Sequence, residues 1–223
     1  MVSIGRIPAL LLMFFLAGCT AFAVSGQFQS GRRALLRNEP ETALAYFQGV
    51  AEKNPNYFYR SVDFRENIWT YIGRAQYETK RYPEARQSLE KALSLDRDDN
   101  LARLYLGLTL VQSGDPSRGV KEIESAMKGI YDFLEHMNRT RPFRAYWDPL
   151  GQIRGEIQKE LAAISGRDSN PEQLIANAEW LGKQMEEEVD RVRDDERRDF
   201  NREGDFERNR SGNSIGVGIG IGF

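Results

Sequence analysis

The chain has 223 residues, with 31 basic and 33 acidic side chains, so its formal net charge at neutral pH is −2. A balance of this kind lacks the basic excess that attracts nucleic acid or anionic lipid, and we expect no nucleic-acid partner. The length allows one domain of ordinary size with additional terminal segments.

The N-terminal residues are typical of an export signal. Arg6 precedes an apolar run from Ile7 to Leu16, which is shorter than the roughly 20 residues that a membrane-spanning helix needs. The run leads into small residues and a cysteine, namely Leu16, Ala17, Gly18 and Cys19. Small residues directly before a cysteine resemble the bacterial lipobox. The resemblance implies cleavage after residue 18 and acylation of Cys19.

Cys19 is the only cysteine in the chain. It cannot form an internal disulfide, and an unused thiol is a liability in an oxidising compartment. An ordinary secretory signal with an incidental cysteine is the alternative, but acylation uses the thiol, and several acyl chains give a lasting anchor. Thr20 stands where an aspartate would resemble an inner-membrane retention signal.

We therefore predict that residues 1–18 are a lipoprotein signal peptide and that residues 19–26 are a lipidated linker. The mature protein is expected on the periplasmic side of the outer membrane. The covalent lipid on Cys19 is the one non-protein group that we expect, with no other cofactor.

A pattern of small and large residues recurs through residues 27–130. Gly73 and Gly107 are 34 residues apart, and the residues at +12, +16 and +19 from each are of matching character. These residues are Ala85, Leu89 and Ala92 in one copy and Gly119, Ile123 and Ala126 in the other. A weaker earlier copy has Gly31, Ala43, Phe47 and Val50 at the same offsets.

This spacing resembles the tetratricopeptide repeat, in which two helices pack as a hairpin. The resemblance implies that the small residues let the helices approach closely and that the large residues at +16 fill the space between repeats. Turn signals occur where the helices must reverse, at 38–40, 80–83 and 114–116, each ending in a proline that is tolerated at a helix start. We predict an all-α, tetratricopeptide-like solenoid of about three repeats, followed by additional helices and a charged, glycine-rich tail.

Eight residues are inserted between the first two copies. The segment from Asn56 to Glu66 contains four aromatic residues, Tyr57, Phe58, Tyr59 and Phe64. Aromatic side chains in a loop can anchor a binding partner. We favour the alternative, in which they pack against the neighbouring helices.

The first helix of each repeat lines the inner wall of such a solenoid. By resemblance, the wall residues are Phe28, Arg32 and Leu35, then Thr70, Arg74, Tyr77 and Glu78, then Leu101, Leu104, Leu108 and Val111. The last group is apolar, which an exposed concave surface rarely is. Either an amphipathic helix of a partner lies there, or later helices of the chain cover it, which we favour. The partner-binding candidates are Arg74, Tyr77, Leu101, Leu104, Leu108 and Val111.

Residues 131–168 are predicted to contain capping helices and a loop. In the loop, Pro142 and Pro149 bracket the aromatic residues Phe143, Tyr146 and Trp147, and Arg139, Arg141 and Arg144 lie nearby in the sequence. This composition is typical of a ligand site, but a connection with its aromatic side chains buried is the interpretation that we favour.

Residues 169–200 are predicted to form a charged amphipathic helix. Its start signal is Asn170 followed by Pro171. A narrowing apolar stripe follows, made of Leu174, Ala178, Leu181, Met185, Val189 and Val192. Beyond it charge dominates, and we expect residues 201–223 to be a disordered tail.

The last residues alternate between glycine and apolar side chains. Ile215, Val217, Ile219, Ile221 and Phe223 are the candidate contact residues of this tail. Period two is the pattern of a strand, and a strand needs another edge to pair with, either in a partner or in copies of itself. A sticky, unstructured tail is the alternative.

We expect no catalytic residues and no metal site. His136 is the only histidine, and no second cysteine exists to share a metal. The acidic pairs alternate with arginines in a solvated helix, which leaves nothing to separate their pKa values. The terminal glycines lack the lysine, the Ser or Thr and the following helix of a phosphate loop.

The leading hypothesis is a lipid-anchored adaptor that mediates protein–protein interactions in the bacterial envelope. The second is a structural subunit of an envelope assembly, or of a secretion, pilus or export complex, that uses the terminal segment for strand addition or for homo-oligomer formation. A cell-wall or polysaccharide enzyme is the third and least favoured. The envelope partners are not identified by the sequence.

Overall fold

The computed structural model describes residues 10–61, 63–140, 147–166 and 170–212, and within these ranges it describes side chains from residue 23 to residue 202. The helices and strands are α1 (Leu10–Leu36), α2 (Pro40–Lys53), β1 (Phe58–Ser61), β2 (Phe64–Asn67), α3 (Ile68–Glu78), α4 (Tyr82–Leu95), α5 (Asn100–Gln112), α6 (Pro116–Thr140), α7 (Gln152–Gly166) and α8 (Pro171–Gly212).

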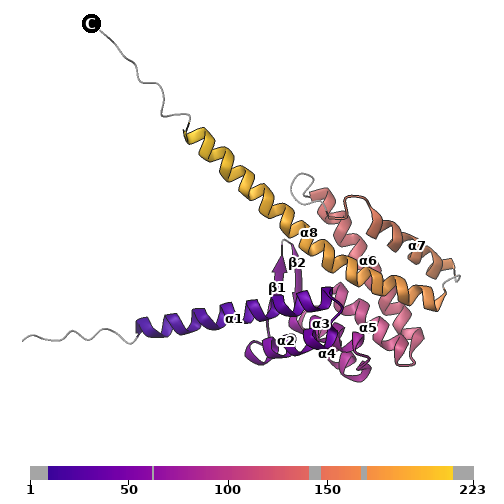
Figure 1. The fold of residues 1–223 in the computed structure, drawn as a ribbon. Coiled ribbons are helices and arrows are strands. Elements are labelled where there is room, and N and C mark those ends of the chain that lie inside the picture. Colours follow the sequence, from indigo (N-terminus) through magenta and orange to yellow (C-terminus); the bar gives the residue numbers. More distant parts are fainter. Residues whose placement is uncertain (1–9, 62, 141–146, 167–169, 213–223) are drawn as a thin grey trace, which may run out of the picture.

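Consecutive helices pack as three hairpins, α1 with α2, α3 with α4, and α5 with α6. The hairpins stack through contacts of α2 with α3 and of α4 with α5, while α8 returns across α5 (Figure 1). This arrangement confirms the predicted all-α solenoid of helical hairpins followed by additional helices.

The repeating glycines lie where two helices of one hairpin meet. A Cβ atom on Gly31 would come within 2.5 Å of the Phe47 ring, and a Cβ atom on Gly107 within 2.7 Å of Ile123 Cγ1. Gly73 faces Leu89 in the same way. The large residue at +16 therefore packs on the glycine of its own hairpin. Phe47 also contacts the next hairpin, because its ring centroid lies 5.2 Å from that of Tyr71. Phe47 therefore packs both within its own hairpin and between repeats, whereas the sequence analysis predicted only the second contact.

The first helix of each hairpin ends in the same way. Asn38, Lys80 and Gly114 lie seven residues after the three glycines, and all three have positive φ angles, of 59°, 61° and 91°. The next residue in each copy donates its backbone N–H to a carbonyl five residues back, from Glu39 to Ala34 in the first. A left-handed residue followed by this bond is the Schellman ending of a helix, which explains the recurring turn signals.

The inserted segment forms a hairpin that the sequence analysis did not predict. Strands β1 and β2 are antiparallel, with Tyr59 opposite Glu66 and Ser61 opposite Phe64. Tyr59 and Phe64 are buried. The Tyr59 ring lies 5.0 Å from that of Phe28, and the Phe64 ring lies 6.0 Å from that of Trp147. Phe64 also lies 6.1 Å from the ring of Phe133 on α6. Tyr59 and Phe64 therefore pack against α1 and α6, as we favoured.

Helix α1 begins before the expected start of the repeats. Residues 19–26, predicted to be a linker, belong to one continuous helix from Leu10 to Leu36. The sequence contains no proline over this range, and isolated glycines such as Gly26 cost a helix only about 1 kcal/mol each. No helix in the described part of the chain is both long and apolar enough to cross a membrane.

Helix α8 begins as predicted and ends later than expected. The Asn170 side chain accepts a hydrogen bond from the backbone N–H of Glu172, at 2.9 Å. The helix continues to Gly212, so the predicted end at residue 200 was too early. Arginine–aspartate pairs three residues apart, such as Arg197 with Asp194 at 3.4 Å, support these turns by a few tenths of a kcal/mol each. The candidate tail contacts at 215–223 lie outside the described residues.

Candidate interaction groove

The first helices of the three hairpins, α1, α3 and α5, form the inner wall that we call the groove. Arg32 on α1 and Arg74 on α3 each follow the repeating glycine of their copy, and Leu108 on α5 holds the same position in the third copy. All three side chains are buried, and Leu108 is 0% exposed. Two copies of the wall are thus cationic at this position and one is apolar.

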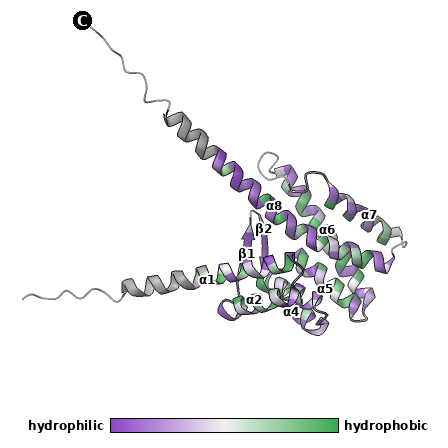
Figure 2. Ribbon diagram, viewed as in Figure 1, coloured by the Kyte–Doolittle hydropathy of each residue, from purple (hydrophilic) through white to green (hydrophobic). Residues whose placement is uncertain are grey.

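Helix α8 covers much of the groove. Its six stripe residues, Leu174, Ala178, Leu181, Met185, Val189 and Val192, are all buried, and α8 contacts α5 directly. Tyr105 of α5 lies against Gly182, where a Cβ atom would not fit. Figure 2 shows the change along the helix, from mixed character over the body to largely hydrophilic beyond it. The chain's own last helix therefore occupies the apolar wall, as we favoured.

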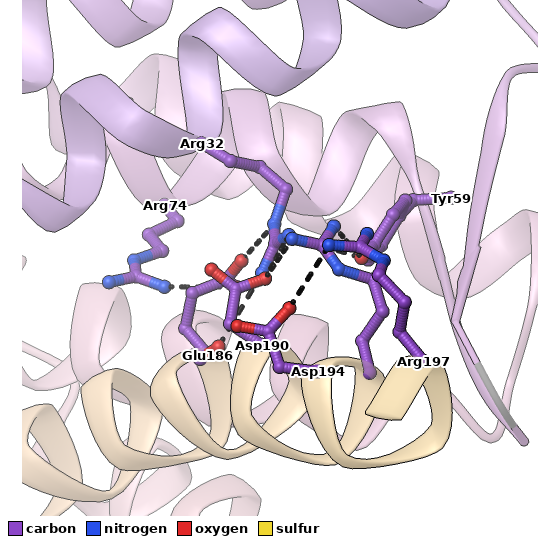
Figure 3. Close-up of polar contacts among 8 residues, drawn as sticks. Arg32, Tyr59, Arg74, Glu186, Asp190, Asp194 and Arg197 are labelled. Carbon is purple, nitrogen blue, oxygen red and sulfur yellow. Dashed lines mark hydrogen bonds and ion pairs between the residues drawn. The ribbon is translucent and has the colours of Figure 1, made fainter. Parts of the chain in front are cut away.

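Carboxylates of α8 neutralise the two buried arginines of the wall (Figure 3). Arg32 Nε donates to Glu186 Oε1, and Arg32 Nη1 lies 2.8 Å from Asp190 Oδ1. Arg74 Nη1 lies 3.6 Å from Glu186 Oε2 and pairs through Nε with Glu78 on its own helix at 2.9 Å. Glu186 thus lies between the arginines of two different repeats.

Aromatic side chains complete the surroundings of both arginines. The Tyr59 hydroxyl accepts a hydrogen bond from Arg32 at 3.1 Å, and the Arg32 guanidinium lies 4.6 Å from the Tyr59 ring centroid. The Arg74 guanidinium lies 5.3 Å from the ring of Tyr105. Nearer the start of α8, the Tyr77 hydroxyl donates to Glu179 Oε1 at 2.5 Å. Polar bonds therefore connect α8 to both of the first two repeats.

The balance of charges keeps both guanidinium groups protonated. Burial alone disfavours the charged form of Arg32, but Glu186 and then Tyr71, Tyr59 and Asp190 outweigh burial, so the pKa of Arg32 lies above its ordinary value. The pKa of Arg74 is raised in the same way, against burial, by Tyr105, Glu78 and Glu186. Removing one partner from a buried ion pair costs about 3–5 kcal/mol, because an uncompensated charge stays behind.

Part of the groove remains open beside α8. A cavity of about 690 Å³ lies among α1, α3, α5 and the first half of α8; we call it the open groove pocket. Tyr77, Tyr82 and Tyr105 line it, with ring centroids of neighbouring pairs 5.8 and 5.9 Å apart. Lys80 and Lys183 also line the pocket and are exposed. Its size falls within the range of about 300–1,000 Å³ that is usual for ligand sites.

The sequence-predicted partner residues divide between these two parts of the groove. Leu101, Leu104 and Leu108 are buried beneath the covering helices, and Val111 is half-buried. In this structure they form core contacts, which agrees with coverage by later helices of the chain, the alternative that we favoured. Arg74 and Tyr77 are buried too, but they line the open groove pocket.

Other predicted features lie away from the groove. Trp147 is completely buried, 5.0 Å from the ring of Phe133, which agrees with a connection whose aromatic side chains are buried; residues 141–146 lie outside the described residues. The backbone of Leu16, Ala17, Gly18 and Cys19 belongs to α1, but their side chains are not among those described. The lipidation of Cys19 therefore stays a prediction.

Sequence reasoning did not find Glu186, Asp190 or Glu179 as groove residues. A signal was present, because Arg32 and Arg74 stand at the same position of two repeats, and two buried arginines require carboxylates opposite them. The acidic residues on α8 were read only as part of a solvated helical face. Whether these three acidic residues face the groove or the solvent depends on the path of α8, which the sequence does not specify.

The repeat itself is recognised by comparison with known families. The family model of the tetratricopeptide repeat matches residues 66–99. This range holds the end of β2, α3, α4 and the turn before α5, which is the second of the three hairpins. A search of curated proteins found no match to the chain. The tetratricopeptide repeat indicates a role in protein–protein interaction.

Proposed function

We propose that the protein is a lipid-anchored adaptor that binds another envelope protein at the open groove pocket, on the periplasmic side of the outer membrane. The observation that carries this proposal is the pocket itself. Tetratricopeptide-like repeats bind partners on their concave wall, and α8 covers that wall while leaving a cavity of about 690 Å³ beside it. In this proposal the protein has no catalytic role of its own.

The chemistry of the open groove pocket suits a segment of polypeptide. Three tyrosines supply apolar ring faces with hydroxyl groups, a combination that is enriched at protein interfaces. Lys80 and Lys183 supply donors for carbonyl groups of a peptide, while Glu78 and Glu179 supply acceptors for its N–H groups. The mixture favours a polar, extended segment of a partner over a purely apolar ligand.

The envelope location in this proposal is supported by the sequence around Cys19. Small residues precede the single cysteine, and an apolar segment with one basic residue precedes those. Acyl labelling in a bacterial host tests the anchor: the wild-type chain should incorporate a labelled fatty acid, and Cys19→Ser should not. Labelling of Cys19→Ser at the wild-type level would exclude a lipid on this residue.

Photo-cross-linking in native membranes tests the adaptor function. A photoreactive residue at Gln112 or Lys183, which both line the open groove pocket and are exposed, should capture the same partner protein. The matched control is Gln87, which is exposed on α4 outside the pocket, and it should capture none. Equal capture from all three positions would contradict binding in the groove.

A second candidate function is a structural subunit that joins an envelope assembly through its C-terminal segment. The outer turns of α8 extend beyond the body of the protein (Figure 1), and Phe200 on them is 76% exposed. Deletion of residues 213–223 separates the two proposals. The adaptor predicts that cross-linking from Lys183 survives the deletion, and the structural subunit predicts that complex formation is lost.

A further inference from the structure

A second cavity, of about 270 Å³, lies where the β-hairpin meets the start of α5; we call it the acidic pocket. Five carboxylate side chains line it: Asp63, Glu66, Asp96, Asp98 and Asp99. Among the described lining residues, the basic one is Arg65, which pairs with Asp96 through Nε at 3.0 Å. Its volume lies just below the usual range for small-molecule sites, so it suits a single side chain.

Two of the carboxylates have structural roles. Asp99 Oδ1 accepts from the backbone N–H of Ala102 at 2.8 Å and thereby caps α5. Asp99 Oδ2 accepts from Thr70 Oγ1 at 2.6 Å and from Asn67 Nδ2 at 3.2 Å. Asp96 is paired with Arg65. The folding of the chain accounts for both groups without any ligand.

Glu66 is different, because one oxygen of its buried carboxylate has no hydrogen-bond partner. The residue is 3% exposed, it lines the acidic pocket, and its Oε2 atom has no hydrogen-bond partner. The Tyr71 hydroxyl nearby is also buried without a hydrogen-bond partner. A buried acceptor without a hydrogen bond costs about 1–3 kcal/mol, and more when it is charged, so a donor placed beside Glu66 Oε2 would be stabilising.

The electrostatic surroundings of Glu66 reinforce this reading. Burial raises the pKa of Glu66 well above its ordinary value, and the charges of Glu186 on α8 and of Asp99 before α5 raise it further. Tyr71 and Arg74 on α3 act in the opposite direction, but their effect is smaller. A cation placed beside Glu66 would favour its ionised form.

The walls of the acidic pocket indicate what kind of cation fits. Phe64, Leu101 and Met185 are buried lining residues, so an apolar surface lies next to the carboxylates. Within the described ranges, no three His, Cys, Asp or Glu side chains converge closely enough to hold a metal ion. A long side chain with an apolar stem and a charged planar end matches such a site, and arginine tolerates burial better than lysine because its guanidinium is less strongly hydrated.

We propose that the acidic pocket binds an arginine side chain of a protein partner, whose guanidinium donates to Glu66. This proposal rests on the adaptor function only in assigning the arginine to a protein. The pocket lies apart from the open groove pocket, since the two share no lining residue. A partner that reaches both pockets would be bound at two separate sites.

The probe for this site is the blocked tripeptide acetyl-Gly-Arg-Gly-amide, titrated into the full chain and followed by backbone amide NMR. Saturable shifts are expected at residues 65, 66, 99 and 101. The citrulline peptide has the same shape without the charge and should bind at least tenfold more weakly. Glu66→Gln should weaken binding of the arginine peptide at least tenfold, and Glu90→Gln, on an exposed part of α4, should leave it unchanged.

A second variant tests the site even if Glu66→Gln fails to fold. Asp98 is an exposed lining residue of the acidic pocket, and Asp98→Lys places a competing cation there without touching the core, so it should also weaken binding at least tenfold. Equal affinity for the arginine and citrulline peptides, or unchanged binding in Asp98→Lys, would overturn the proposal. The titration needs no natural partner, so its failure leaves the cross-linking test of the adaptor function unaffected.

Discussion

Arg32 in the first hairpin donates to Glu186 on the last helix, 154 residues further along the chain. Both side chains are about 1% exposed. This ion pair, with Arg74 on the other side of Glu186, connects the beginning, the middle and the end of the fold. The groove of the repeats and the helix that covers it are therefore held together by charge as well as by apolar contact.

Glu186→Ala should destabilise the protein by about 3–5 kcal/mol, because it leaves two buried guanidinium groups without their shared carboxylate. Urea unfolding followed by circular dichroism measures the change. Glu187→Ala is the matched control. Glu187 is the next residue and is exposed; it accepts a hydrogen bond from Gln184 at 2.9 Å and lies 3.8 Å from Lys183. Because these contacts are exposed, the change should shift stability by under about 0.5 kcal/mol. Equal effects of the two substitutions would mean that α8 does not lie against Arg32 and Arg74.

Gly107→Ala should destabilise the protein by about 1–3 kcal/mol through overpacking. The added Cβ would lie 2.8 Å from the backbone oxygen of Gly119, in the partner helix of the same hairpin, and that oxygen cannot rotate away. In Gly155→Ala, on α7, the Cβ meets nothing within 4 Å, and the change should stabilise the protein by about 0.5–1 kcal/mol. Thermal unfolding of both variants gives the comparison, and a neutral Gly107→Ala would contradict the close packing of α5 on α6.

Lys80→Gly should stabilise the protein by about 0.5–1 kcal/mol. Lys80 has a φ angle of 61° at the end of α3, a left-handed conformation that costs residues other than glycine roughly 1–2 kcal/mol. Gly114 holds the equivalent position in the third hairpin. As a control, Gln87→Gly on the exposed face of α4 should destabilise by about 1 kcal/mol. Destabilisation by Lys80→Gly would be evidence that the turn differs from the Schellman ending.

The stability of the protein should depend on pH through Asp99. Burial raises the pKa of Asp99 from 3.8 to about 6, against the lowering effect of its hydrogen bonds with Thr70 and Ala102. Between these values the folded state binds more protons than the unfolded state, so this group's contribution to stability is present below pH 4 and is lost as the pH rises to about 6.

Asp99→Asn removes that titration while keeping an acceptor for the cap of α5. The free energy of unfolding of the variant, relative to that of the wild-type chain, should therefore increase between pH 4 and pH 6. The charge of Asp99 also raises the pKa of Glu66, so the substitution lowers the pKa of Glu66 and changes the difference in the same direction. A difference that is constant across this range would mean that Asp99 has an ordinary pKa in the folded state.

The hairpins could be predicted because their signals are local. Gly31, Gly73 and Gly107 recur with partners at fixed offsets, and each turn carries residues that suit it. The path of α8 was open between two alternatives, since the apolar stripe from Leu174 to Val192 indicates a buried face without saying which surface buries it. The β-hairpin was missed because four-residue strands with side chains such as Arg60 and Arg65 lack a clear period-two pattern.

The details of the groove depend on contacts between residues far apart in the sequence. Arg74 was chosen as a partner-binding candidate because wall residues usually face a ligand, and its actual neighbours, Glu186 and Glu78, satisfy it within the chain. The buried state of Glu66 likewise follows from the β-hairpin, which the sequence did not reveal. Local patterns thus predict the wall, and the three-dimensional path of α8 decides which part of it stays open.

Hydrogen exchange of the backbone amides of α8 tests most directly whether the last helix lies in the groove. We predict that residues 174–192 are protected as strongly as the core helices α3 and α5, because their apolar face is buried, and that residues 193–202, which lie beyond the buried stripe, exchange much faster. Uniformly fast exchange over residues 174–202 would contradict a groove that is filled by the chain's own helix.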